Sequence, residues 1–217
     1  MKRIFLISAF LSSCLLANSE ISTNYTYKDY KNSKTKTQGK TLDYRFLHNF
    51  ENSQITVNYE DSLTKRENEI TKAKLTSLEV EKLSMKYLYN ISDDLSFKTS
   101  FINIEDNLAP TDNGKIYGLG LSKSIDNSNE IKVDTYLSDY DDFNVNQYDL
   151  TFVKKFKFND INFMGQTGVK YIDINGSEYG NYTLKDNYYT SYFLNLNANY
   201  NSFIFGLGFM NGDRLFA

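Results

Sequence analysis

The chain of 217 residues has one cysteine, one proline and one histidine, and no apolar run as long as a membrane-spanning helix needs, about 20 residues. The single proline, Pro110, excludes collagen-like and proline-rich classes. A formal net charge of −3 argues against a nucleic-acid binder that relies on bulk positive charge. Aromatic residues make up 16% of the chain, which is far too many for a disordered protein. The composition therefore indicates a folded protein without a membrane-spanning helix.

The amino-terminal segment has the features of a secretory signal peptide. A basic start precedes an apolar run over residues 4–17, and small residues occupy the third-last and last positions before a cut after Ser19. We therefore expect a signal peptide at 1–19 and a mature domain at 20–217; a buried amino-terminal helix is the alternative for this segment. Cys14 ends a stretch that resembles a lipoprotein cleavage box, so lipidation stays open. Cleavage after Ser19 would leave no cysteine for a disulfide.

From residue 20 onward, apolar and polar residues alternate with a period of two. In residues 131–137, for example, Ile, Val, Thr and Leu alternate with Lys, Asp and Tyr. An amphipathic helix would instead space its apolar residues three and four apart. The pattern predicts strands with one apolar and one polar face. Eleven strands are expected, near residues 20–28, 40–49, 53–61, 76–91, 94–104, 115–125, 130–138, 146–158, 161–174, 188–200 and 202–210.

Short turns and longer polar loops alternate between the expected strands. Short turns are expected at 49–53, 92–94, 126–130, 159–160 and 201–202, and longer loops at 29–40, 62–75, 105–115, 138–146 and 175–188. This habit is typical of an outer-membrane barrel with tight periplasmic turns and longer outside loops. Tyr and Phe near strand ends favour the same fold, since a ring at headgroup level keeps its body apolar and its hydroxyl in water. We predict an all-β, antiparallel up-and-down transmembrane β-barrel of about 10–12 strands.

Eleven is an odd number, whereas bacterial single-chain barrels have an even number of strands. Either one strand is missed or split in this prediction, or the chain is incomplete. The segment after residue 210 begins like a loop and stops where a last strand would start. We therefore favour a barrel that lacks its last strand.

The polar faces of the strands predict the lining of the barrel. A narrow lumen would be plugged by opposite charges that pair across it, whereas a wider one would hold a water-filled passage. A mixed lining predicts weak ion selectivity. The lining candidates are Asp43, Arg45, Asn58, Glu60, Lys86, Lys98, Lys132, Asp134, Gln147, Asp149, Gln166, Lys170, Asn195 and Asn197. Aromatic residues expected at the lipid interface are Tyr87, Tyr89, Tyr148, Phe158, Tyr171, Tyr192 and Tyr200.

With its signal peptide, alternating strands, tyrosine-rich strand ends and alternating connections, the chain resembles small porin-like outer-membrane β-barrel proteins of Gram-negative bacteria. The resemblance implies a place in the cell outer membrane, among its lipids, and a passive channel for small hydrophilic solutes. It also implies periplasmic chaperones and the barrel-assembly machinery as partners during biogenesis. Two alternatives stay open. One is a plugged barrel with a structural or surface-interaction role through its extracellular loops, and the other is a soluble periplasmic β-protein or lipoprotein that binds a ligand.

No motif in the sequence predicts catalysis. Barrel hydrolases generally pair a histidine with Ser or Asp. The one histidine, His48, is expected beside a short periplasmic turn, as an interfacial aromatic residue. The acidic residues Asp139, Asp141 and Asp142 lack the spacing and the glycine of a calcium loop. We therefore expect no enzymatic activity, cofactor, metal ion or nucleic-acid partner, and the sequence predicts no oligomeric state.

Overall fold

The computed structural model describes residues 18–30, 33, 35–107, 111–175, 178–179, 182–183, 187–201 and 203–212. The signal peptide expected at 1–19 lies outside this part of the chain except for its last two residues, and so does the segment after residue 212. In the described part no helix is long and apolar enough to cross a membrane. The strands are β1 (Ser19–Asp29), β2 (Lys36–Asn49), β3 (Ser53–Glu67), β4 (Lys74–Asn90), β5 (Leu95–Asp106), β6 (Lys115–Ser124), β7 (Asn129–Asp139), β8 (Asn144–Phe158), β9 (Ile161–Asn175), β10 (Glu178–Tyr179), β11 (Tyr182–Thr183), β12 (Tyr188–Tyr200) and β13 (Phe203–Gly212).

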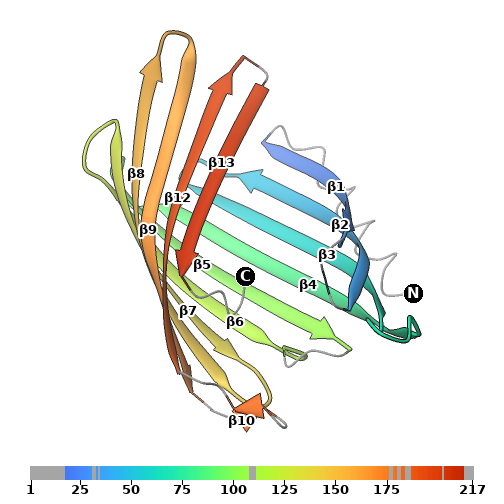
Figure 1. Cartoon of the computed structure of the whole chain (residues 1–217). Helices are drawn as coiled ribbons and strands as arrows, with labels where there is room; N and C mark the ends of the chain where they lie inside the picture. Colours follow the sequence, from blue (N-terminus) through green and yellow to red (C-terminus); the bar gives the residue numbers. More distant parts are fainter. Residues whose placement is uncertain are drawn as a thin grey trace. The chain divides into compact units, whose positions relative to one another are not determined.

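Eleven of these strands form one antiparallel up-and-down sheet (Figure 1). Its strand order is β1-β2-β3-β4-β5-β6-β7-β8-β9-β12-β13, so each strand pairs with its neighbours along the chain. This confirms the predicted all-β, antiparallel up-and-down class, and every expected strand is present. The remaining two strands, β10 and β11, pair only with each other inside the connection between β9 and β12. The sequence did not predict this small hairpin.

The chain divides into two compact units. The first comprises residues 1–87 and 100–115, and the second comprises 88–99 and 116–217. In the first unit β2 pairs along its length with β1 and β3. In the second unit the ladders join β7 to β8, β8 to β9, β9 to β12 and β12 to β13. Each unit therefore has its own continuous set of strand pairs, and the units are described separately below.

Two of the connections are shorter than the sequence indicated. The loop expected at 62–75 is reduced to residues 68–73, and the loop expected at 138–146 is reduced to the four residues 140–143. The prediction that short and long connections alternate strictly is therefore wrong at this second position. The reason is that the ladder depends on backbone groups: residues 64–67 are polar on both faces, but the strand still pairs there with the start of β2. Likewise the Tyr140 N–H donates to the Phe143 carbonyl at 3.1 Å and closes a tight turn.

The tight turns are stabilised by asparagine and aspartate. Asn159 and Asn201 have φ values of 52°, in the left-handed region that asparagine tolerates in two-residue hairpin turns. In the turn between β6 and β7, the Asp126 carboxylate accepts hydrogen bonds from the Asn129 side chain at 2.8 Å and from two backbone N–H groups. The Asn129 side chain is the largest cause of a lowered pKa for Asp126, and the charge of Lys154 contributes. Lys154 itself is an exposed residue on the apolar face of β8.

The sheet exposes apolar side chains and shields polar ones. In β8, Tyr148 and Leu150 are each 50% exposed, whereas the side chain of Asp149 between them is 16% exposed. In β6, Tyr117, Leu119 and Leu121 are exposed and the intervening glycines are buried. This distribution is the reverse of that in a water-soluble protein, where charged residues are almost never the more buried set.

Candidate functional site

The candidate site in each unit is the polar face of its strands, because the strand registers within the unit bring predicted lining residues together there. Residues directly opposite each other in an antiparallel ladder project from the same face. Arg45 on β2 lies opposite Asn58 on β3, and Asp43 lies opposite Glu60. In the second unit Asp149 on β8 lies opposite both Asp134 and Lys170 on its two neighbours.

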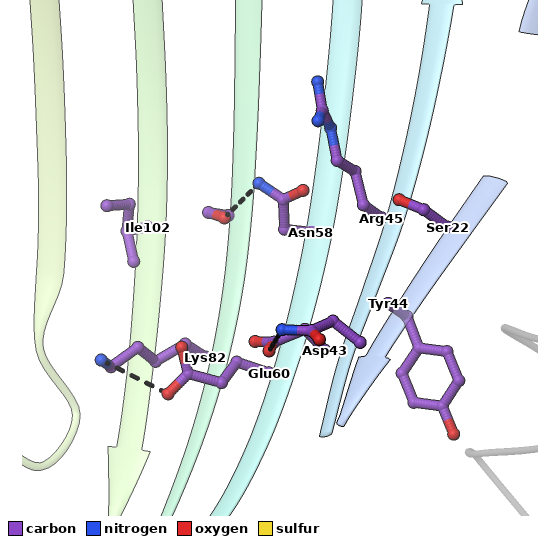
Figure 2. Close-up of a pocket in the computed structure, with 10 residues that line it drawn as sticks. Ser22, Asp43, Tyr44, Arg45, Asn58, Glu60, Lys82 and Ile102 are labelled. Carbon is purple, nitrogen blue, oxygen red and sulfur yellow. Dashed lines mark hydrogen bonds and ion pairs between the residues drawn. The ribbon is translucent and has the colours of Figure 1, made fainter. Parts of the chain in front are cut away.

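In the first unit this face forms a pocket of about 440 Å³ (Figure 2). Two rows of side chains cross it. The arginine row consists of Ser22, Arg45, Asn58 and Ser84, and the acidic row consists of Asn24, Asp43, Glu60 and Lys82. The Asn58 amide donates to the Ser84 hydroxyl at 3.3 Å, and Lys82 Nζ lies 3.6 Å from Glu60 Oε1. The Asn24 amide donates to the Asp43 carboxylate at 3.4 Å.

Four members of these rows were missed by the sequence reasoning: Ser22, Asn24, Lys82 and Ser84. Ser22 and Asn24 could have been predicted from the sequence. Successive residues of a strand point to opposite faces, which places these two on the face of β1 opposite to Tyr25 and Tyr27. The grouping into rows was not available, since it depends on which residues of β1, β2 and β3 are opposite each other.

In the second unit the polar face is crossed by ion pairs, which we call the lysine network. Lys98 Nζ lies 2.5 Å from Asp134 Oδ1 and 5.9 Å from the centre of the Tyr136 ring. Lys170 Nζ lies 3.6 Å from Asp149 Oδ2, which also accepts a hydrogen bond from Gln147 at 3.0 Å. The network is completed by Glu130, which pairs with Lys132 at 3.3 Å and with Lys155 at 3.8 Å.

A glycine makes room for the shortest of these pairs. A Cβ atom at Gly120 would collide with the Asp134 carboxylate and would lie 3.0 Å from Lys98 Cε. Gly120 is therefore a packing position beneath the Lys98–Asp134 pair. At Gly168 a Cβ would similarly meet the Phe193 ring at 2.7 Å.

The remaining lining candidates are placed by their strands. Asn195 on β12 is opposite Gln166 and Gly208, and Asn197 is opposite Gly206. Lys86 is an exposed residue of β4. The predicted interface aromatics, Tyr87, Tyr89, Tyr148, Phe158, Tyr171, Tyr192 and Tyr200, are all exposed.

An apolar cluster on the polar face was not predicted. Tyr140 and Phe143, from the turn between β7 and β8, are buried against Val145, Ile172 and Ile174, with Tyr189 packed beside them. Val145 lies opposite Ile174 in the ladder and has the same parity along β8 as Asp149, so the cluster shares the face of the lysine network. Burial raises the pKa of the Tyr140 hydroxyl. The turn therefore folds over the polar face at this end of the second unit.

Removal of one ring from this cluster should be costly. We expect Phe143→Ala to lower the free energy of unfolding by about 3 kcal/mol, because a buried ring is lost and a cavity remains. Asp142→Ala, at the adjacent exposed position, is the matched control and should stay within about 0.5 kcal/mol. Denaturant unfolding followed by tyrosine fluorescence measures both variants. Equal losses would contradict the packing of this turn.

His48 is held by a serine and by aromatic neighbours. Its Nδ1 lies 2.8 Å from Ser19 Oγ, and its ring meets the Phe50 ring edge-on with 4.4 Å between centroids. A catalytic serine and histidine would need a third group to orient the imidazole, and none of the ion pairs found among the described residues involves His48. In the same part of the chain, no group of three or more His, Cys, Asp or Glu side chains is placed to hold a metal ion.

Comparison with known proteins adds no assignment. No protein-family model matches the chain, and no curated protein shows significant similarity to it. The functional argument therefore depends on the geometry of the sheet and on the chemistry of its two faces.

Proposed function

We propose that the protein is an outer-membrane β-barrel that forms a passive, porin-like channel for small hydrophilic solutes. The observation that carries this proposal is the reversed burial of the sheet, with leucine, tyrosine and phenylalanine exposed and ion pairs shielded on the opposite face. In water the exposed apolar face would be costly, at about 25 cal/mol per Å². Lipid outside and water inside would satisfy both faces. Strands in lipid must pair on both edges, which requires a closed barrel.

The spacing of aromatic residues supports a membrane of ordinary thickness. On β8, exposed Tyr148 lies near the end that follows the 140–143 turn, and exposed Phe158 lies at the opposite end. At about 3.3 Å per residue they are separated by about 33 Å along the strand. A strand tilt of about 40° reduces this to about 25 Å, the height of the apolar band of outer-membrane barrels.

The lysine on the apolar face of β8 is compatible with this placement. Lys154 lies opposite Asn129, the first residue after a tight turn. A lysine costs little near the membrane interface and about 2–4 kcal/mol at the midplane. A lysine side chain this close to a strand end can extend along the strand so that its ammonium reaches water.

A second candidate function has its own support. The lysine network and the apolar cluster both occupy the polar face of the second unit, as they would in a plugged barrel with a structural or surface-interaction role. Against this alternative, eleven strands exceed the eight that side chains just fill. We therefore favour the open channel.

One preparation tests both candidates. Refolded protein should migrate differently on an SDS gel before and after boiling, and it should give discrete current steps in a planar bilayer. A salt gradient should give a reversal potential close to zero, because the lining carries both signs of charge. A band that does not shift would contradict the barrel, and a shifting band with a silent bilayer would contradict the channel and favour the plugged barrel.

A further inference from the structure

Two unpaired charges of opposite sign lie side by side in the pocket of the first unit. Arg45 and Asp43 are two residues apart on β2 and project from the same face (Figure 2). Within the described residues neither is part of an ion pair. We infer that this pocket binds small amphoteric solutes whose carboxylate and ammonium groups are several bonds apart, such as ω-amino acids and short peptides.

The lack of a close ion contact distinguishes Arg45 from Lys82 in the same pocket and from three lysines on the polar face of the second unit. Lys82, Lys98, Lys132 and Lys170 each have a carboxylate oxygen within 4 Å. Arg45 instead lies between Ser22 and Asn58, which are neutral. Its guanidinium is exposed in the pocket and directed away from Asp43 (Figure 2). A planar fork of N–H donors beside a hydroxyl and an amide is suited to a carboxylate.

The acidic row supplies the opposite charge. Asp43 and Glu60 lie directly opposite each other, and Lys82 neutralises only one of the two carboxylates. The row therefore has a net charge of −1, whereas the arginine row has a net charge of +1. The two facing carboxylates repel each other, because like charges directly opposite on neighbouring strands are destabilising. A bound ammonium group would relieve this repulsion.

The distance between the rows sets the length of the solute. Residues two apart on a strand are separated by about 6.6 Å, and the Arg45 side chain extends this distance. A solute with only a negative charge would be repelled by the acidic row. A solute with only a positive charge would be repelled by Arg45. A solute with both charges separated by several bonds would be favoured by both rows.

This inference rests on the proposed channel only in that the pocket must be open to solutes, so binding is tested without conductance. The probe is 5-aminopentanoate, titrated into refolded protein in detergent and followed by saturation-transfer NMR. Pentanoate and pentylammonium, which each have one of its two charges, are the ligand controls. Arg45→Gln and Asp43→Asn are the test variants, Arg45→Lys preserves the charge, and Lys155→Gln is a control outside the pocket. Gel migration before and after boiling shows that each variant is folded.

We expect the probe to bind more tightly than either control ligand. Arg45→Gln and Asp43→Asn should each weaken its binding roughly three- to ten-fold, a modest factor because the pocket is open to water. Arg45→Lys should retain most of the affinity, and Lys155→Gln should retain all of it. The inference is overturned if the probe binds no better than pentanoate or pentylammonium, or if folded Arg45→Gln and Asp43→Asn bind like the natural chain. Conductance without binding would refute this inference alone, and binding without conductance would refute the channel alone.

Discussion

An arginine in place of Leu150 is expected to lower the free energy of unfolding in lipid vesicles by about 2–4 kcal/mol, the cost of arginine at the bilayer midplane. Leu150 lies near the centre of β8, is 50% exposed, and is opposite Val133 and Val169 on the neighbouring strands. In a water-soluble sheet the same half-exposed position would accept arginine at little cost. Reversible urea unfolding of the refolded protein measures the difference.

The matched control for Leu150→Arg is Asn127→Arg. Asn127 is an exposed residue of the turn between β6 and β7, where water is available in any setting. This variant should change the free energy of unfolding by less than about 0.5 kcal/mol. If the two arginine variants are equally stable, lipid does not contact the apolar face and the membrane proposal is wrong.

The second large effect is expected for Lys98→Met, which should cost about 2–3 kcal/mol. Lys98 and Asp134 have side chains that are only 22% and 14% exposed. Without the lysine, Asp134 would face Asp149 across the β7–β8 ladder with no counter-charge of its own. Facing like charges are destabilising, and a shielded unpaired carboxylate adds to that cost.

The pair can be separated from simple loss of packing by a double-variant cycle. Lys98→Met combined with Asp134→Asn removes both charges and keeps the volume above Gly120, so about half of the loss should be recovered. Lys155→Met is the control, because Lys155 is 56% exposed and its pair with Glu130 is 3.8 Å long. That variant should cost less than about 0.5 kcal/mol. Additive losses for Lys98 and Asp134 would show that the two side chains do not act as a pair.

Much of this fold could be predicted from the sequence because its main signal is local. Strict alternation in a segment such as 131–137 determines both the strand and its two faces, without knowledge of any partner. The signal was lost where polar residues occupy both faces, as at 64–67, and there the strand was predicted too short. The signal was also misleading at 138–146. The acidic residues there indicated a long polar loop, but Tyr140 and Phe143 between them fold into the apolar cluster.

The candidate site could be predicted only as a set of residues. Parity places Asp43, Arg45 and Glu60 on a polar face, but pairing across strands depends on register, which the alternation does not determine. The sequence therefore could not show that Lys82 pairs with Glu60 rather than Asp43, or that Arg45 lies among neutral side chains. Those two facts are the basis of the proposed amphoteric site.

The up-and-down order of the sheet has a consequence for how the chain acquires its structure. Each described ladder joins strands that are consecutive in the sheet order, and the connections that close them range from two residues at 159–160 to six at 68–73 and twelve at 176–187. The entropy lost in closing a loop grows with its length, so these hairpins form at low cost. Folding can therefore advance one hairpin at a time from any starting pair. Each new hairpin needs only the strand already at the edge of the sheet, so its formation does not depend on distant parts of the chain.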